Sequence, residues 1–195
     1  MMKTFKTKLI CGLIAVALVL GACAKPPTEE MNNAAAAVTR AENDADAVTY
    51  AGSTLSRARD ALSRMQTEAD SKRYDAAKTY AAEAIAAADK AIADGRSGAA
   101  RARDEAAALV DSLRPAIAET EQTIRSAQTR GNVQVDFTAV NQDFDAARRT
   151  ADQAAISLAG NNYQDALDKG RSARAGLSDI NARLTSAATA ASRKK

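Results

Sequence analysis

Small apolar residues, mostly alanine, recur at every third or fourth position along most of this 195-residue chain. One such series is Tyr74, Ala77, Ala81, Ala84, Ile85, Ala88 and Ile92. This spacing places the side chains on one face of an α-helix. Alanine also has the highest helix propensity, and a chain rich in alanine with few prolines and glycines is typical of long helices. The sequence therefore predicts an all-α protein.

Turn-forming residues divide this pattern into helices. The first helix is predicted to begin with Thr28 as its N-cap and to end near Asn43, because threonine is a good cap and two acidic residues follow it. A loop is expected over residues 44–52. Either Ser53 or Thr54 is expected to cap the second helix.

The third predicted helix is long and runs from Arg73 to about Thr129, after a tight turn at residues 70–72. Pro115 should kink this helix or end it locally, because proline lacks the backbone donor and clashes with the preceding turn. The alternative is two helices with a break between Gly95 and Gly98, since glycine weakens a helix interior.

The second half of the chain repeats this order of elements. Residues 130–132 form a stop signal, and residues 133–136 form a short extended linker. A helix is predicted from Phe137, a turn at residues 160–162, and a final helix from Tyr163 that ends in the basic tail.

The central parts of the two halves align without gaps at an offset of 89 residues. Matching positions are Leu55 with Phe144, Ala58 with Ala147, Tyr74 with Tyr163, Ala77 with Ala166, Ala84 with Ala173, and Ala88 with Leu177. We therefore predict two tandem three-helix units, 29–95 and 96–192, that share one long helix. Tight turns make neighbouring helices antiparallel, and a thin alanine core favours an elongated, coiled-coil-like bundle. Both tyrosines are expected to pack against the preceding helix.

Residues 1–22 have the composition of an export signal. Basic residues at positions 3, 6 and 8 precede an apolar run from Leu9 to Leu20, which is shorter than the roughly twenty residues of a transmembrane helix. Removal of residues 1–22 leaves 24 basic and 24 acidic residues. The remaining chain is then close to neutral, which argues against nucleic acid as a partner.

The four residues Leu20, Gly21, Ala22 and Cys23 resemble a bacterial lipobox. The resemblance implies cleavage before Cys23, a diacylglycerol on its thiol and an acyl chain on its amino group, with residues 23–28 as a lipidated linker. The next residue is Ala24 rather than the aspartate that retains lipoproteins in the inner membrane. We expect a lipid anchor in the outer membrane that faces the periplasm, with surface exposure as the alternative. Ordinary signal cleavage, which would leave Cys23 as an idle thiol, is the competing interpretation.

The segments 55–62 (LSRARDAL) and 73–77 (RYDAA) resemble an Ala-rich helical domain of unknown function found in Gram-negative lipoproteins. The resemblance is clearest over residues 51–92. It implies a helix that carries leucine and alanine, a turn, and a second Ala-rich helix. Because the family's function is undefined, the resemblance implies a fold and a location but no activity.

Residues that commonly carry catalysis are scarce in this sequence. The chain contains no histidine, and Cys23 would be its only cysteine after signal removal. It has no Gly-rich phosphate loop and no nucleophile elbow. We expect neither an enzyme nor a cofactor. Glu42, Asp44 and Asp46 could bind a cation weakly, but a solvated turn explains them better.

The function expected from these observations is structural scaffolding or protein docking in the cell envelope. One alternative is a module that binds a helix of another envelope protein. A second is a spacer linked to peptidoglycan through Lys195, because the basic tail 193–195 resembles the end of the major murein lipoprotein. Compensation of the helix dipole also explains basic residues in that position.

Overall fold

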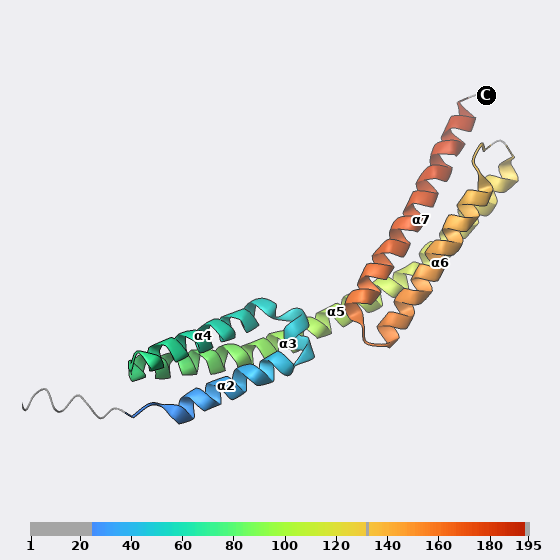
Figure 1. The fold of residues 1–195 in the computed structure, drawn as a ribbon. Helices are drawn as coiled ribbons and strands as arrows, with labels where there is room; N and C mark the ends of the chain where they lie inside the picture. The colour runs from blue at the N-terminus through green and yellow to red at the C-terminus, as the bar shows by residue number, and fades with distance from the viewer. Residues whose placement is uncertain (1–24, 132, 194–195) are drawn as a thin grey trace, which may run out of the picture. The chain divides into compact units, whose positions relative to one another are not determined.

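The computed structural model describes residues 25–131 and 133–193. This part of the chain forms six α-helices and contains no strand. The helices are α2 (Thr28–Asn43), α3 (Ala45–Tyr50), α4 (Gly52–Asp70), α5 (Tyr74–Arg130), α6 (Phe137–Ala159) and α7 (Tyr163–Ser192) (Figure 1). The prediction of an all-α helical bundle is confirmed.

The chain divides into two compact units, Met1–Arg96 (unit 1) and Ser97–Lys195 (unit 2). Helices α2, α3 and α4 lie in unit 1, and α6 and α7 lie in unit 2. Helix α5 contributes its residues up to Arg96 to unit 1 and its residues from Ser97 onward to unit 2.

The core of unit 1 consists mostly of alanine. Helix α5 contributes five alanines that are at most 1% exposed, at positions 77, 81, 84, 88 and 91. Larger buried side chains come from the other helices and include Val38, Leu55 and Met65. Because an alanine side chain ends at Cβ, such helices can approach to the low end of the usual interaxial range of about 8–10 Å.

Residues 44–52 do not form the predicted loop, because most of them form helix α3. Asp44 is the N-cap of α3, and its carboxylate accepts a hydrogen bond of 2.8 Å from the backbone nitrogen of Ala47. Ala47 is fully buried in the core of unit 1. Capping and burial therefore outweigh the weak helix propensity of Val48 and Thr49.

Helix α3 packs directly against α5 at Gly95. A Cβ atom added to Gly95 would lie 2.5 Å from the backbone nitrogen of Ala47 and 2.6 Å from the carbonyl carbon of Asp46. Helix α5 nevertheless continues through Gly95 and through Pro115. The predicted long helix is therefore confirmed, whereas the alternative break between Gly95 and Gly98 and a local end at Pro115 are wrong. Gly95 provides room for a neighbouring backbone and does not end a helix.

Two predicted N-caps are also wrong. The N-cap of α2 is Pro27, and Thr28 is the first residue of the helix. The N-cap of α4 is Ala51, because α3 leads into α4 without the extended residue that a capping serine or threonine requires. The hydroxyl of Thr54 instead donates a hydrogen bond of 2.9 Å to the carboxylate of Asp94 on α5.

Unit 2 packs α6, α7 and its part of α5 around a core with larger side chains. Ile124, Val140, Phe144, Leu177, Ile180 and Leu184 belong to one buried cluster. Gly131, with a φ of 66°, follows the end of α5 as predicted. Asp136 caps α6 by accepting hydrogen bonds from the backbone nitrogens of Thr138 (2.9 Å) and Ala139 (3.1 Å).

The turn between α4 and α5 and the turn between α6 and α7 have the same local geometry. Lys72 (φ 58°) and Asn161 (φ 60°) both occupy the left-handed region. In each turn a backbone N–H donates to a carbonyl five residues earlier, from Arg73 to residue 68 and from Asn162 to residue 157, both at 2.9 Å. All of these positions correspond at the offset of 89 residues.

We predict that Gly95→Ala destabilises unit 1. The added methyl group must displace the α3 backbone, and overpacking of this kind typically costs about 1–3 kcal/mol. Gly52→Ala is the matched control, because a Cβ at Gly52 meets nothing within 4 Å. Hydrogen exchange of unit 1 amides measures both effects. Equal protection in the two variants would contradict the proposed close contact.

Candidate interaction groove

Helices α5 and α7 run in the same direction through unit 2. Three sets of buried residues pair these helices at a constant offset: Ala106 with Ala166, Leu113 with Ala173, and Ile124 with Leu184. Helix α6 covers one side of this pair, since Val140 and Phe144 share a cluster with Ile124 and Leu184. Two hollows lie on the other side of the pair, and residues of both α5 and α7 line them. We call this side the α5–α7 seam.

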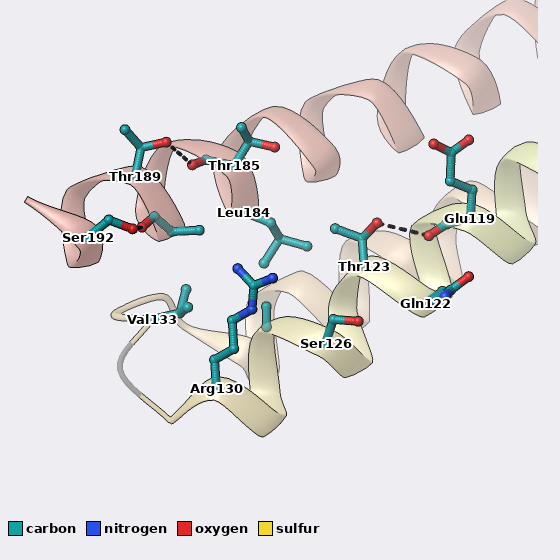
Figure 2. Close-up of a pocket in the computed structure, with 12 residues that line it drawn as sticks. Glu119, Gln122, Thr123, Ser126, Arg130, Val133, Leu184, Thr185, Thr189 and Ser192 are labelled. Atoms are coloured by element: carbon teal, nitrogen blue, oxygen red, sulfur yellow. Dashed lines mark hydrogen bonds between the residues drawn. The ribbon is translucent and has the colours of Figure 1, made fainter.

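The first hollow of the seam lies near the ends of α5 and α7 and has a volume of about 520 Å³ (Figure 2). Its α5 side includes Glu119, Gln122, Thr123, Ser126 and Arg130, and its α7 side includes Leu184, Thr185, Ala188, Thr189 and Ser192. Val133 also lines the hollow, and Val133 and Leu184 are 7% and 1% exposed. Apolar residues and small hydroxyl side chains therefore form most of its surface.

Several hydroxyl groups in this hollow are bound to the backbone of their own helix. Thr123 donates to the carbonyl oxygen of Glu119, Thr189 to that of Thr185 and Ser192 to that of Ala188, each at 2.9 Å (Figure 2). Their hydrogens are thus already used within α5 and α7. What these side chains offer to a partner is a methyl or methylene group and an acceptor oxygen.

The first hollow also contains two charged groups that are not neutralised by neighbours. Arg130 and Glu119 make no ion pair with any residue that the structure describes. Arg130 extends from the last turn of α5 into the hollow (Figure 2). A cation near the carboxyl end of a helix interacts favourably with the helix dipole.

A second hollow of about 580 Å³ lies on the same seam. Its lining comes from α5 (Glu105, Ala108, Leu109 and Ser112) and from α7 (Arg171, Arg174, Ala175 and Ser178). Arg171 and Glu105 form an ion pair of 2.8 Å across the seam. Arg174 makes no ion pair within residues 25–131 and 133–193.

Leu109 packs over Gly170 beside this second hollow. A Cβ atom added to Gly170 would lie 2.7 Å from Cδ2 of Leu109. The absence of a side chain at Gly170 therefore lets Leu109 pack against the α7 backbone.

Ser157, Asp165 and Lys169 form the cluster that most resembles catalytic machinery. The Lys169 Nζ lies 3.2 Å from the Ser157 Oγ and 2.5 Å from the Asp165 Oδ2. Hydrogen bonds from Lys169 and then Ser157 lower the pKa of Asp165. Ser157 and Lys169 both donate hydrogen bonds to the same carboxylate oxygen of Asp165. Because Ser157 lies on α6 and the other two residues lie on α7, the cluster links these helices.

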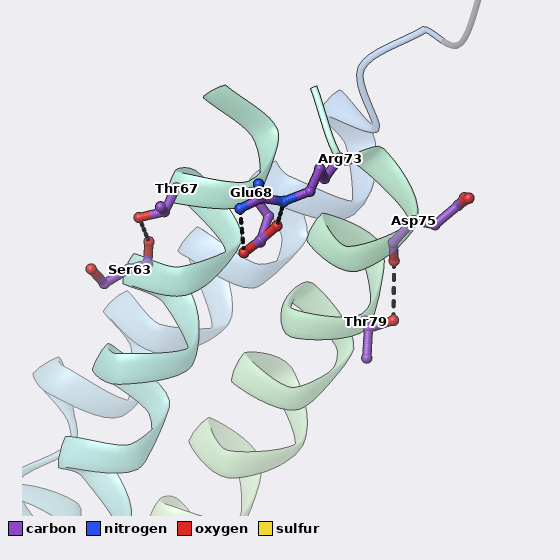
Figure 3. A network of polar contacts seen from close by, with 6 residues as sticks. All are labelled: Ser63, Thr67, Glu68, Arg73, Asp75 and Thr79. Atoms are coloured by element: carbon purple, nitrogen blue, oxygen red, sulfur yellow. Dashed lines mark hydrogen bonds and ion pairs between the residues drawn. The ribbon is translucent and has the colours of Figure 1, made fainter. Parts of the chain in front are cut away.

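A second polar cluster closes the turn between α4 and α5 (Figure 3). Arg73 binds both carboxylate oxygens of Glu68, with Nη2 at 3.0 Å from Oε1. This bond lowers the pKa of Glu68 and raises that of Arg73. Thr67 and Thr79 each donate 3.0 Å hydrogen bonds to carbonyls of their own helices. The contact between Arg73 and Glu68 therefore joins the two sides of the turn, and the threonines bind within their own helices.

Leu20, Gly21, Ala22, Cys23 and Lys195 lie outside the residues that the structure describes.

Glu42 and Asp44, two of the three acidic residues considered as a weak cation site, have different partners. Glu42 accepts a hydrogen bond of 2.7 Å from Arg59, and Asp44 caps α3. No group of three potential metal ligands occurs among the described residues.

Tyr163 packs beside Ala106, Ala166 and Leu167, and Leu158 of α6 belongs to the same cluster. Its hydroxyl lies 2.8 Å from the side-chain oxygen of Asn161, to which it donates a hydrogen bond.

Residues 29–107 match the family described as Domain of unknown function (DUF4398). A domain of unknown function is therefore found over the helices of unit 1 and the first part of α5 in unit 2. No curated protein and no solved structure matches the chain. None of the described helices combines the length and the hydropathy needed to cross a membrane.

We predict that the contact between α6 and α7 weakens in acid. The pKa of Asp165 is lowered in the folded chain, so its stabilising effect is present above the ordinary carboxyl range and is lost as the pH falls through the folded pKa. Urea unfolding between pH 7 and pH 2.5 should therefore show a smaller loss of stability in Asp165→Asn than in the unchanged chain.

Asp145→Asn is the control for this measurement, because Asp145 is an exposed α6 residue without an ion pair among the described residues. It should retain the pH dependence of the unchanged chain. An identical dependence in Asp165→Asn would contradict the assigned role.

Proposed function

We propose that this chain is a lipoprotein of the bacterial cell envelope whose helical units act as a scaffold or docking module. The observation that carries this proposal is the sequence Leu20-Gly21-Ala22-Cys23 directly after a basic segment and a short apolar run. The match of residues 29–107 agrees with the resemblance to a domain of unknown function and assigns no activity.

The start of the fold supports an anchor at Cys23. Helix α2 begins at Thr28, and buried Pro27 forms its N-cap. Five residue steps separate Cys23 from Thr28, so an extended linker would span at most about 17–18 Å. Several acyl chains on Cys23 would then hold unit 1 close to the membrane surface.

We propose a role that involves neither catalysis nor a cofactor, and the chemistry of the described residues supports it. The sequence contains no histidine, and the cluster of Ser157, Asp165 and Lys169 links α6 to α7. The balanced charge after signal removal gives no electrostatic support for binding nucleic acid. Ala24 favours the outer membrane, facing the periplasm, as the location.

We further propose that the α6–α7 hairpin is a second copy of the α4–α5 hairpin. Helices α4 and α6 end at Asp70 and Ala159, and α5 and α7 begin at Tyr74 and Tyr163, so both pairs differ by 89 residues.

A contact between the two helices of each hairpin also recurs at this offset. The pair Thr54–Asp94 (2.9 Å) corresponds to Asp143–Arg183 (2.5 Å). The alanine pattern alone would not produce such a polar correspondence.

Replacement of the proposed anchor tests the location. Cys23→Ser should leave the chain unprocessed or release it into the soluble periplasmic fraction, because serine cannot carry the thioether-linked lipid. Cys11→Ser is the matched control, since the same exchange inside the predicted signal should not affect lipidation. Fractionation and metabolic labelling with a fatty acid measure both variants. Unchanged processing and membrane retention of Cys23→Ser would refute the lipid anchor.

A link to peptidoglycan through Lys195 is the second candidate, because this lysine follows the end of α7 by three residues. Digestion of purified cell walls should then release muropeptides that carry the C-terminal residues, and Lys195→Arg should remove them. Lys194→Arg is the control and should leave them unchanged. Cell walls without such muropeptides would exclude the spacer function.

A further inference from the structure

We propose that the α5–α7 seam of unit 2 binds an acidic amphipathic α-helix from another envelope protein. This inference rests on the docking role proposed above and assigns a surface and a partner chemistry to it. Three observations support it. They are the spacing of the seam residues, the hydrogen bonds from several seam hydroxyls to backbone carbonyls, and the charged residues of the seam that make no ion pair.

Both walls of the seam repeat every seven residues. The α5 wall contains Glu105, Ser112, Glu119 and Ser126, and the α7 wall contains Arg171, Ser178, Thr185 and Ser192. Each α7 residue follows its α5 counterpart by 66 residues, so the two rows stay in register along both hollows. Residues seven positions apart lie on the same face of an α-helix, so each row forms a continuous wall along which a further helix can pack. The α5 row spans about 32 Å, which corresponds to about 21 residues of helix.

The side chains of the seam favour a helix over a sugar or another highly polar ligand. Alanine, serine and threonine leave space for a backbone to approach closely. The hydroxyl of Ser112 donates to the carbonyl of Leu109 at 2.6 Å, and Thr123, Thr189 and Ser192 donate to carbonyls in the same way. An apolar helix face can therefore cover these groups without leaving their donors unsatisfied.

The charges specify an acidic partner. Glu105 and Arg171 neutralise each other across the seam. Arg130, Arg174 and Glu119 remain without an ion pair to any described residue, which leaves an excess of positive charge along the hollows. Because α5 and α7 both end near Arg130, an antiparallel partner would place its first turn there. Acidic residues are favoured in the first turn of a helix and would face Arg130.

A second copy of this chain is a poorer occupant. Helix α2 has two acidic residues, Glu29 and Glu30, in its first turn. However, Glu30 lies 3.4 Å from Lys78, and Ala34, Val38 and Ala41 are buried in the core of unit 1. Helix α2 could bind the seam of another copy only by leaving its own core.

Peptide binding to the full chain purified in detergent tests the proposal. The probe is a fluorescent 24-residue helical peptide with one face of alanine and leucine. It has glutamates in its first turn and at the position that would lie opposite Arg174. A second peptide has the same design with lysines in place of those glutamates. Fluorescence anisotropy should show binding of the acidic peptide only. Arg130→Glu should weaken it by roughly tenfold, as reversal of a contacting charge does.

Arg149→Glu is the matched control, because Arg149 is exposed on α6 and has no ion pair among the described residues. It should leave the affinity unchanged. Ser126→Trp, which fills the first hollow, should abolish binding, whereas Asp152→Trp on the exposed face of α6 should not. Circular dichroism of each variant verifies that the helices remain folded.

Three outcomes would overturn the proposal. The first is equal binding of both peptides, and the second is binding that survives Ser126→Trp. The third is self-association of the chain that Arg130→Glu abolishes in sedimentation, which would assign the seam to a second copy. A failed peptide experiment would not affect the fractionation result for Cys23→Ser, so failure of the site and failure of the lipid anchor remain distinguishable.

Discussion

Close packing of helices through alanine is the interaction on which unit 1 depends. Alanines at positions 77, 81, 84, 88 and 91 of α5 form a buried row, and Gly95 continues it. Each such side chain buries little apolar area, so stability must come from many short contacts between helices that lie close together. This arrangement tolerates little extra volume. The closest approach is at Gly95, where the α3 backbone occupies the space that a side chain at Gly95 would need.

Unit 2 uses small residues differently. Its core contains Phe144, Leu177 and Ile180, which bury more apolar area per residue than alanine. Ala106, Ala166 and Ala173 are buried between its helices, but serine, threonine and alanine also lie along the α5–α7 seam, where α6 does not cover them. In unit 1 small residues lie between packed helices, whereas in unit 2 they additionally line two hollows. This contrast is the physical reason to regard the seam as an unfilled helix-packing surface.

The sequence predicted features that depend on neighbouring residues and missed those that depend on distant ones. Gly131 and Asn161 identified turns, because glycine and asparagine tolerate the left-handed region that both adopt. Helix α3 was missed, since its formation depends on burial of Ala47 against α5 as well as on the local Asp44 cap. The seam was missed for a similar reason. Its two rows are 66 residues apart, and only their parallel packing makes a single surface of them.

The ion pairs of the two hairpins help to distinguish structural charges from charges available to a partner. Lys90–Asp94 (2.8 Å) in unit 1 corresponds to Asp179–Arg183 (3.4 Å) in unit 2, with the signs reversed. Exposed ion pairs of this kind contribute little stability. Either residue of the pair can therefore carry the positive charge, provided that the other carries the negative charge. Arg130 has no such match among the described residues and extends into a hollow. Its charge interacts favourably with the dipole of α5 but is not used in an ion pair there, so it stays available to the acidic partner that we propose for the seam.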